Sequence, residues 1–252
     1  MELIGIGYSP WTEKARWALS YHQIPYRYHE HLLIFGVPAL RWKLKKWSGG
    51  VTVPALIDDE NGVRLMDSFD IAKYADQIGK AETLFPEELL QGIEHLNSLS
   101  EEALDAARAW VMDRVLKNRD MQLENIPNFI PGFVRSSSAW MTRMGLSYLD
   151  YEFGVSAKVL EQRLADMRRV LSEFQKILRE KNFGFVLGNR FTYADLLVAA
   201  TIQIVRPEAG FAQRKMGPSM RVAWETPELL SEFKDLLEWR DQMYAQYRLI
   251  KK

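Results

Sequence analysis

Residues 53–74 read VPALIDDENGVRLMDSFDIAKY and predict two short strands, a tight turn and a helix, in that order. Asn61-Gly62 separates the two apolar runs, and this dipeptide is a strong signal for a hairpin turn. Asp67-Ser68 follows the second run and predicts the start of a helix ending near Gly79, because Asp and Ser are favoured N-cap residues. The stretch therefore contributes two strands and a covering helix to a small sheet.

The residues before this stretch alternate between strand-like and helix-like segments. An apolar run at Leu3–Ile6 suits a buried strand. Ser9-Pro10 predicts a helix start, because Ser is a favoured N-cap and Pro fits the first helical position. Aromatic residues alternate along 26–32, which predicts a second strand, and residues 38–47 have helical character. The predicted order is βαβαββα, an α/β domain with a mixed sheet covered by helices on both faces.

After Leu84-Phe85-Pro86 the strand signal disappears. Amphipathic helical periodicity then continues to the end of the chain, most clearly at residues 89–99, 102–116, 157–179 and 227–247. Residues 125–151 contain several Pro and Gly and are predicted to form a looped or broken-helix segment. We therefore expect two domains, an α/β domain over residues 1–82 and an all-α domain over residues 87–252.

The composition excludes several classes of function. The chain has 33 Lys plus Arg against 33 Asp plus Glu, and proteins that bind nucleic-acid backbones usually have a basic excess, so we expect no nucleic-acid partner. No apolar run approaches the roughly 20 residues of a membrane-spanning helix, and no secretory signal is visible. We therefore expect a cytoplasmic protein with no membrane partner. The absence of Cys excludes disulfides, thiolate nucleophiles and Cys-bound metals.

Residues 41–47 read RWKLKKW and form a basic cluster that interrupts the charge balance. We interpret it as a solvated helix in which Trp42 and Trp47 are packing anchors, with nucleic-acid binding as the alternative. His29 and His31 would point to one face of the second predicted strand, as a metal-binding pair does. No third ligand is evident, so we predict no metal site.

Four motifs, taken together and in order, resemble those of the glutathione transferase superfamily. YSPWTEKAR at residues 8–16 is similar to the first active-site turn of serine-type members, in particular the plant tau class and many bacterial relatives. VPAL at 53–56, DSFDIAKY at 67–74 and GNRFTYAD at 188–195 resemble three further motifs of the family. The resemblance spans nearly the whole chain and implies a thioredoxin-like domain followed by an all-helical domain.

The resemblance also implies a site and partners. It makes Ser9 the catalytic residue that activates the thiol of glutathione. It assigns glutathione binding to Trp11, Val53, Pro54, Asp67 and Ser68. Glutathione is then a co-substrate, and no metal or bound cofactor is implied. The expected partners are glutathione, a small apolar electrophile in a detoxification reaction, and a second copy of the chain, since relatives usually form homodimers.

Ser9 would stabilise a thiolate at a helix N-terminus. A free thiol has a pKa near ~8.5, and lowering it by about two units requires roughly 2.7 kcal/mol. One hydrogen bond to a charged group supplies about 1.5–3 kcal/mol, and the positive end of the helix dipole adds to it. Tyr8 is the second candidate for the donor. The alternative for Ser9 is a purely structural N-cap.

The other motifs suit the rest of a tripeptide. Pro54 resembles a cis-proline, which would leave the Val53 N–H and C=O free to pair with an extended peptide; an ordinary trans-proline opening a strand is the alternative. Asp67 offers a carboxylate to an α-amino group, and Ser68 offers a hydroxyl and N–H groups to an α-carboxylate. A plain capping pair is the alternative for both.

Further positions depart from the family pattern or carry no chemistry. Relatives place a lysine shortly before the Val-Pro turn, and here Lys45 or Lys46 is the nearest in sequence. Thr192 and Asp195 form a capping-box pattern, to which we assign a folding role. An apolar electrophile pocket, or plain core, is predicted at Trp110, Met112, Trp140, Met141 and Met144.

The favoured function is therefore a glutathione transferase that adds the thiol of glutathione to an electrophile. The alternative is a non-catalytic glutathione-binding or scaffold protein with the same fold. A thiol-disulfide reductase of this fold would need an enzyme cysteine, which the chain lacks.

Overall fold

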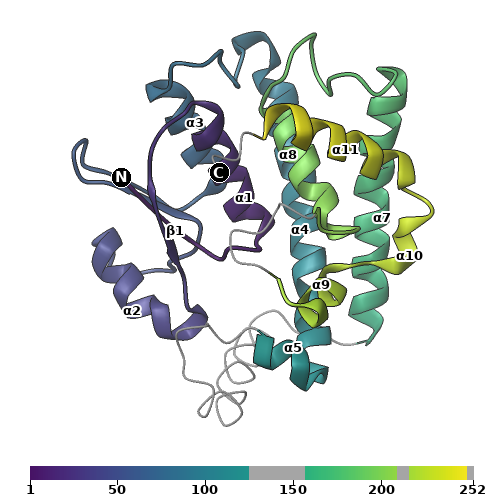
Figure 1. Cartoon of the computed structure of the whole chain (residues 1–252), viewed down its shortest axis with the longest axis horizontal. Helices are drawn as coiled ribbons and strands as arrows, with labels where there is room; N and C mark the ends of the chain where they lie inside the picture. Colours follow the sequence, from purple (N-terminus) through teal and green to yellow (C-terminus); the bar gives the residue numbers. More distant parts are fainter. Residues whose placement is uncertain (125–156, 209–215, 249–252) are drawn as a thin grey trace.

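The computed structural model describes residues 1–124, 157–208 and 216–248 of the chain (Figure 1). The N-terminal elements follow the predicted order: β1 (Glu2–Gly5), α1 (Pro10–Tyr21), β2 (Arg27–Glu30), α2 (Leu33–Leu44), β3 (Ala55–Asp58), β4 (Val63–Leu65) and α3 (Ser68–Ile78). The later elements of the described residues are all helical: η1 (Glu87–Leu89), α4 (Leu90–Lys117), α5 (Arg119–Glu124), α7 (Ala157–Glu180), α8 (Tyr193–Thr201), η2 (Ile202–Ile204), α9 (Pro218–Trp224), α10 (Pro227–Leu230) and α11 (Lys234–Tyr247). The predicted looped segment 125–151 lies outside the described residues.

The four strands form one mixed sheet in the order β2-β1-β3-β4. β1 runs parallel to β2, with Leu3 opposite Tyr28, and antiparallel to β3, with Ile4 opposite Ala55. β4 pairs with β3 through the predicted hairpin, in which Gly62 has a φ of +69°, a conformation that glycine reaches without steric cost. The predicted combination of a thioredoxin-like region and a helical region is confirmed.

Helices cover both faces of the sheet (Figure 1). α2 packs on one face, where Leu40 and Leu44 join Ile57 in a buried cluster. On the other face Leu3 and Leu56 belong to the same core as α1, α3 and the helices that follow. Alternate residues of each strand therefore contact different layers, as the period of two along a strand requires.

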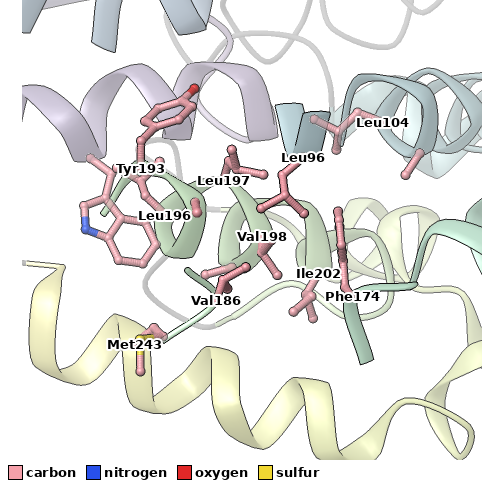
Figure 2. Packing of buried hydrophobic residues seen from close by; sticks show 14 of the residues in the cluster. Leu96, Leu104, Phe174, Val186, Tyr193, Leu196, Leu197, Val198, Ile202 and Met243 are labelled. Carbon is pink, nitrogen blue, oxygen red and sulfur yellow. The ribbon is translucent and has the colours of Figure 1, made fainter. Parts of the chain in front are cut away.

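One hydrophobic core connects the sheet region with the helical region. α8 lies within it, and every residue of this helix is buried, including the polar Asp195 and Thr201. Figure 2 shows Leu197 and Val198 of α8 packed among side chains of neighbouring elements, including Leu96 of α4 and Phe174 of α7. Ala15 and Ala18 of α1 also belong to this core, so the first helix is held between the two regions.

The helical region differs from the prediction in two places. The periodic segments 89–99 and 102–116 form the single helix α4, because the junction contains neither Gly nor Pro. Ser100 at this junction is buried, and its hydroxyl lies 2.7 Å from Thr201 Oγ1 of α8. The predicted helix 227–247 is instead divided into α10 and α11. None of the described helices combines the length and apolar character needed to cross a membrane.

The two tryptophans of the basic cluster are not packing anchors, so that prediction is wrong. Trp42 is 68% exposed and Trp47 is 72% exposed. Leu40 and Leu44 lie one turn apart and form the buried side of α2, which turns Trp42 away from the sheet. α2 also ends before Trp47, because Lys45 adopts a left-handed conformation with a φ of 55°.

A carboxylate in α3 fastens α1 and the connection to the helical region. Asp76 accepts hydrogen bonds from Thr83 Oγ1 at 2.6 Å and from the Leu84 N–H at 2.5 Å, and it lies 3.1 Å from His22 Nε2. Burial raises the pKa of Asp76, but the hydrogen bonds from these partners lower it by a larger amount. The pKa of Asp76 therefore lies below its ordinary value. The ionised carboxylate therefore stabilises the folded state.

We expect Asp76→Ala to lower the free energy of unfolding by about 2 kcal/mol, because the Leu84 N–H is left without an acceptor. Since the pKa of Asp76 is depressed, its contribution is present above the unfolded pKa of about 3.9 and is lost as the pH falls through the folded pKa. Urea unfolding at neutral and acidic pH measures both effects. Asp70→Ala, an exposed change on the same helix, should stay within about 0.5 kcal/mol of wild type. Equal losses in the two variants would contradict the assigned role.

Candidate functional site

The turn between β1 and α1 carries Ser9 and is fixed by side chains from both sides. The Ile6 N–H donates to Thr12 Oγ1 at 3.2 Å, and the Gly7 N–H donates to Glu30 Oε2 at 3.1 Å. The Ser9 N–H donates to the Ile6 carbonyl at 2.9 Å. Ser9 therefore has a defined position directly after the first strand.

Ser9 occupies the N-cap position of α1, with Pro10 as the first helical residue. Its φ of −83° and ψ of 130° are typical of an N-cap, yet its hydroxyl makes no capping hydrogen bond. The residue is only half-buried. The Ser9 hydroxyl is thus left for another acceptor, at the end of α1 where the helix dipole favours negative charge.

Tyr8, the second candidate donor, packs toward the helical region. Its ring meets Trp224 of α9 edge to face, with centroids 6.1 Å apart. Trp224 belongs to a buried cluster of α4, α5 and α9 that includes Met112 and Met220, and Tyr8 packs against this cluster. Of the predicted pocket residues, Met112 lies in this cluster and Trp110 packs against the main core, while Trp140, Met141 and Met144 lie outside the described residues.

Trp11 contacts the helical region through a carboxylate of α4. Its indole Nε1 donates to Glu101 Oε2 at 2.6 Å, and the Arg108 guanidinium lies 5.4 Å from its ring centroid. Lys14, one turn further along α1, is fully buried and donates to Glu101 Oε1 at 2.5 Å. Glu101 therefore joins the first turns of α1 to α4, and the indole N–H of Trp11, which was predicted to bind glutathione, already has a protein acceptor.

The Val53–Pro54 peptide bond is cis, as the resemblance implied. Pro54 is buried and Val53 is half-buried, directly before β3 begins at Ala55. Among the described residues, no hydrogen bond engages the N–H or C=O of Val53. This edge of the backbone is consequently open to an extended peptide.

Asp67 and Ser68 begin α3 in different environments. Asp67 is exposed and caps the helix, because its Oδ1 accepts from the Phe69 N–H at 2.8 Å and the Asp70 N–H at 3.3 Å. The second oxygen, Oδ2, makes no hydrogen bond to a described residue. Ser68 is buried, and its hydroxyl lies inside the protein beside Tyr193. At this helix end, the side chain open to solvent as a ligand is therefore the Asp67 carboxylate and not the Ser68 hydroxyl.

The register of the strands brings the Ser9 turn, the Val53–Pro54 turn and the start of α3 to one end of the sheet. Because β1 is antiparallel to β3, with Ile4 opposite Ala55, the turn after β1 lies beside Val53. β4 is antiparallel to β3, with Leu65 opposite Leu56, so Asp67 emerges at the same end. Ser9, Val53 and Asp67, which are far apart in the sequence, therefore lie at the same end of the sheet.

Two acidic residues support this edge, and the sequence did not single them out. Glu30 ends β2 and accepts from the Gly7 N–H and from the Tyr28 hydroxyl at 2.8 Å. Glu101 lies about ninety residues beyond Trp11 and holds it across the two regions. Neither residue belongs to a local motif. Contacts between residues so far apart in the sequence produce no pattern that sequence analysis could detect.

The remaining predicted positions are placed as follows. Lys45 caps α2 and is exposed, and Lys46 is partly exposed beside the loop that leads to Val53. His29 Nε2 lies 3.7 Å from Glu2, and β2 ends before His31. Within the described residues, no three His, Asp or Glu side chains converge as a metal site would require.

Two family models match the chain and together span most of it. The glutathione S-transferase N-terminal domain matches residues 8–78, and the glutathione S-transferase C-terminal domain matches residues 142–249. No curated protein matches the chain at a significant level of similarity.

Solved structures of glutathione transferases have the same fold. An enzyme named GSTFuA3 from Phanerochaete chrysosporium is 16% identical, with a TM-score of 0.63 and coverage of 100% of this chain and 98% of that one. A glutathione S-transferase from Methylobacillus flagellatus with glutathione bound is 17% identical, with a TM-score of 0.61 and coverage of 97% and 95%. A glutathione S-transferase of Ceriporiopsis subvermispora in complex with glutathione is 15% identical, with a TM-score of 0.60 and coverage of 100% and 98%.

Proposed function

This chain belongs to the glutathione S-transferase family, and from this we propose that it activates the thiol of glutathione and adds it to a small, largely apolar electrophile. The observation that carries the proposal is Ser9, an N-cap whose hydroxyl makes no capping bond at the start of α1. Glutathione acts as co-substrate, with no metal or resident cofactor. We further propose the serine-type subclass, a homodimer and a detoxification role, as the motif resemblance implies, and a cytoplasmic location.

In the proposed reaction the glutathione thiol loses its proton to solvent and the Ser9 O–H donates to the resulting thiolate. A lone pair on sulfur then forms a carbon–sulfur bond, and the electrons of the broken bond leave with the departing group or move onto the electrophile. The helix dipole and one charge-assisted hydrogen bond match the roughly 2.7 kcal/mol needed to lower the thiol pKa by about two units.

The rest of glutathione fits the groups at the same sheet edge. The open N–H and C=O of Val53 would pair with the peptide backbone as a short added strand. The free Oδ2 of Asp67 would accept from the α-amino group, and the Ser68 N–H, which the Asp67 side chain does not cap, would bind the α-carboxylate. Lys45 and Lys46 are the two candidates for the glycine carboxylate. Tyr8 and the adjoining Met-rich cluster border the place for the electrophile.

The competing proposal is a glutathione-binding or scaffold protein without turnover. Two assays on the purified protein separate the two. Retention on immobilised glutathione together with conjugation of at least one member of a broad electrophile panel, such as chlorodinitrobenzene, supports the transferase. Retention without any conjugation assigns the scaffold role, and failure of retention contradicts both.

Asp67 allows its two roles to be measured separately. Asp67→Asn should keep the helix cap, because Asn caps as well as Asp, but should weaken glutathione binding about tenfold through loss of the charged partner of the amine. Asp67→Ala should weaken binding similarly and also lower the free energy of unfolding by about 1 kcal/mol. Calorimetric titration and urea unfolding measure these effects. Wild-type affinity in Asp67→Asn would remove Asp67 from the binding site.

A further inference from the structure

The exposed tryptophans lie in the part of the chain with the most one-sided charge. Residues 31–57 contain four Lys or Arg and no Asp or Glu, although acidic and basic residues balance over the whole protein. All four cations fall within residues 41–47. We call the set Arg41, Trp42, Lys43, Lys45, Lys46 and Trp47 the basic tryptophan surface.

The internal contacts of this surface leave it positively charged. Arg41 donates to the Gly49 carbonyl at 2.8 Å, which satisfies a donor without neutralising the charge. Lys43 pairs with Glu2, whose carboxylate is the one acidic partner of the surface among the described residues. Lys45 and Lys46 make no ion pair with any described residue. The net charge of the surface together with Glu2 is therefore positive.

The fold gives the two tryptophans no packing role. α2 is anchored to the sheet by Leu40 and Leu44 on its opposite side, and Trp42 and Trp47 are both more than two thirds exposed. Trp42 lies on the exposed side of α2 and Trp47 lies just beyond its end. Exposed tryptophans interleaved with lysines are typical of segments that lie on membrane surfaces. The indole ring suits the headgroup region because it has an apolar body and a polar N–H.

We propose that the basic tryptophan surface binds an anionic lipid bilayer, with Trp42 and Trp47 at the headgroup level and Lys45 and Lys46 against the lipid anions. Charge complementarity selects this occupant. A two-fold contact with the same surface of a second copy would set four cations against four cations. A nucleic-acid strand requires cations distributed along a groove, whereas these lie within seven consecutive residues, 41–47. Lys45 and Lys46 are also the two candidates for the glycine carboxylate of glutathione, so vesicle binding is measured with no glutathione present.

Vesicle sedimentation tests it with the full-length protein. We expect binding to vesicles that contain phosphatidylglycerol, weakening as salt is added, and no binding to pure phosphatidylcholine vesicles. A basic residue near an anionic surface accounts for about fivefold in affinity, so Lys45→Glu/Lys46→Glu should reduce binding at least about tenfold. Trp42→Ala/Trp47→Ala should give a similar loss.

The matched control is Lys176→Glu/Lys181→Glu, which makes the same charge change at exposed positions on and after α7. It should bind within about twofold of wild type, since its charges lie away from the proposed contact. Far-UV spectra and melting temperatures establish that each variant is folded. Absence of binding to anionic vesicles at low salt, or unchanged binding by the tryptophan variant, overturns the proposal. The proposal is also overturned if the tryptophan variant still binds vesicles but no longer forms a dimer that the wild-type protein forms. The same holds if it loses only an affinity for a single-stranded oligonucleotide.

Discussion

Replacing Ser9 by alanine is expected to move the pH midpoint of glutathione conjugation upward by about two units, toward the ~8.5 of a free thiol. The change removes the hydroxyl that would donate to the thiolate and leaves the dipole of α1 in place. At pH 7 the ionised fraction of bound glutathione should fall about 25-fold. The less acidic thiol is the stronger nucleophile once ionised, which offsets most of the loss, so the rate at pH 7 should fall about threefold.

The fold should be unaffected by this change, because the Ser9 hydroxyl makes no capping hydrogen bond. We therefore expect a melting temperature within a degree or two of wild type, in contrast to the loss that follows removal of a working cap. Tyr8→Phe is the matched control, since it removes the neighbouring hydroxyl and keeps the ring against Trp224. A midpoint that moves in Tyr8→Phe and stays in Ser9→Ala would transfer the donor role to Tyr8.

Asp195→Ala is expected to cause the largest loss of stability, about 4 kcal/mol. The carboxylate is fully buried and accepts from the Val186 N–H at 2.7 Å, the Thr192 N–H at 2.8 Å and Thr192 Oγ1 at 3.1 Å. Alanine leaves both N–H groups buried without an acceptor, at roughly 1–3 kcal/mol each. Urea unfolding, or the soluble yield if the variant does not fold, measures the effect.

The pKa of Asp195 adds a dependence on pH. Burial raises this pKa to about 6, against the lowering effect of the hydrogen bonds from Val186 and Thr192. A carboxyl with a raised pKa binds its proton more tightly in the folded protein, so its contribution to stability falls as the pH rises from about 4 to about 6. Thr192→Ala loses one donor and should cost less, about 1 kcal/mol. Near wild-type stability of Asp195→Ala would refute the assignment of a folding role.

Features encoded by neighbouring residues were predictable from the sequence. Asn61-Gly62 predicted the hairpin, Ser9-Pro10 predicted the start of α1, and Thr192 with Asp195 predicted the capping box, which the structure confirms. Each of these depends on backbone conformation and hydrogen bonds within a few residues.

Features that depend on tertiary packing were not predictable. The exposure of Trp42 depends on which side of α2 meets the sheet, and a helix with Trp, Leu and Lys at successive positions offers more than one apolar side. The continuity of α4 through Ser100 depends on a partner hydroxyl at Thr201, and the acceptor for Trp11 comes from Glu101. Sequence spacing carries no record of such contacts.

The central claim is that glutathione binds with its sulfur at the first turn of α1 as a thiolate. Ultraviolet titration of the thiolate absorbance of bound glutathione in the wild-type protein tests this most directly. The account predicts a thiol pKa about two units below the ~8.5 of a free thiol. A bound thiol that titrates like free glutathione would contradict it, and so would a protein that fails to bind glutathione.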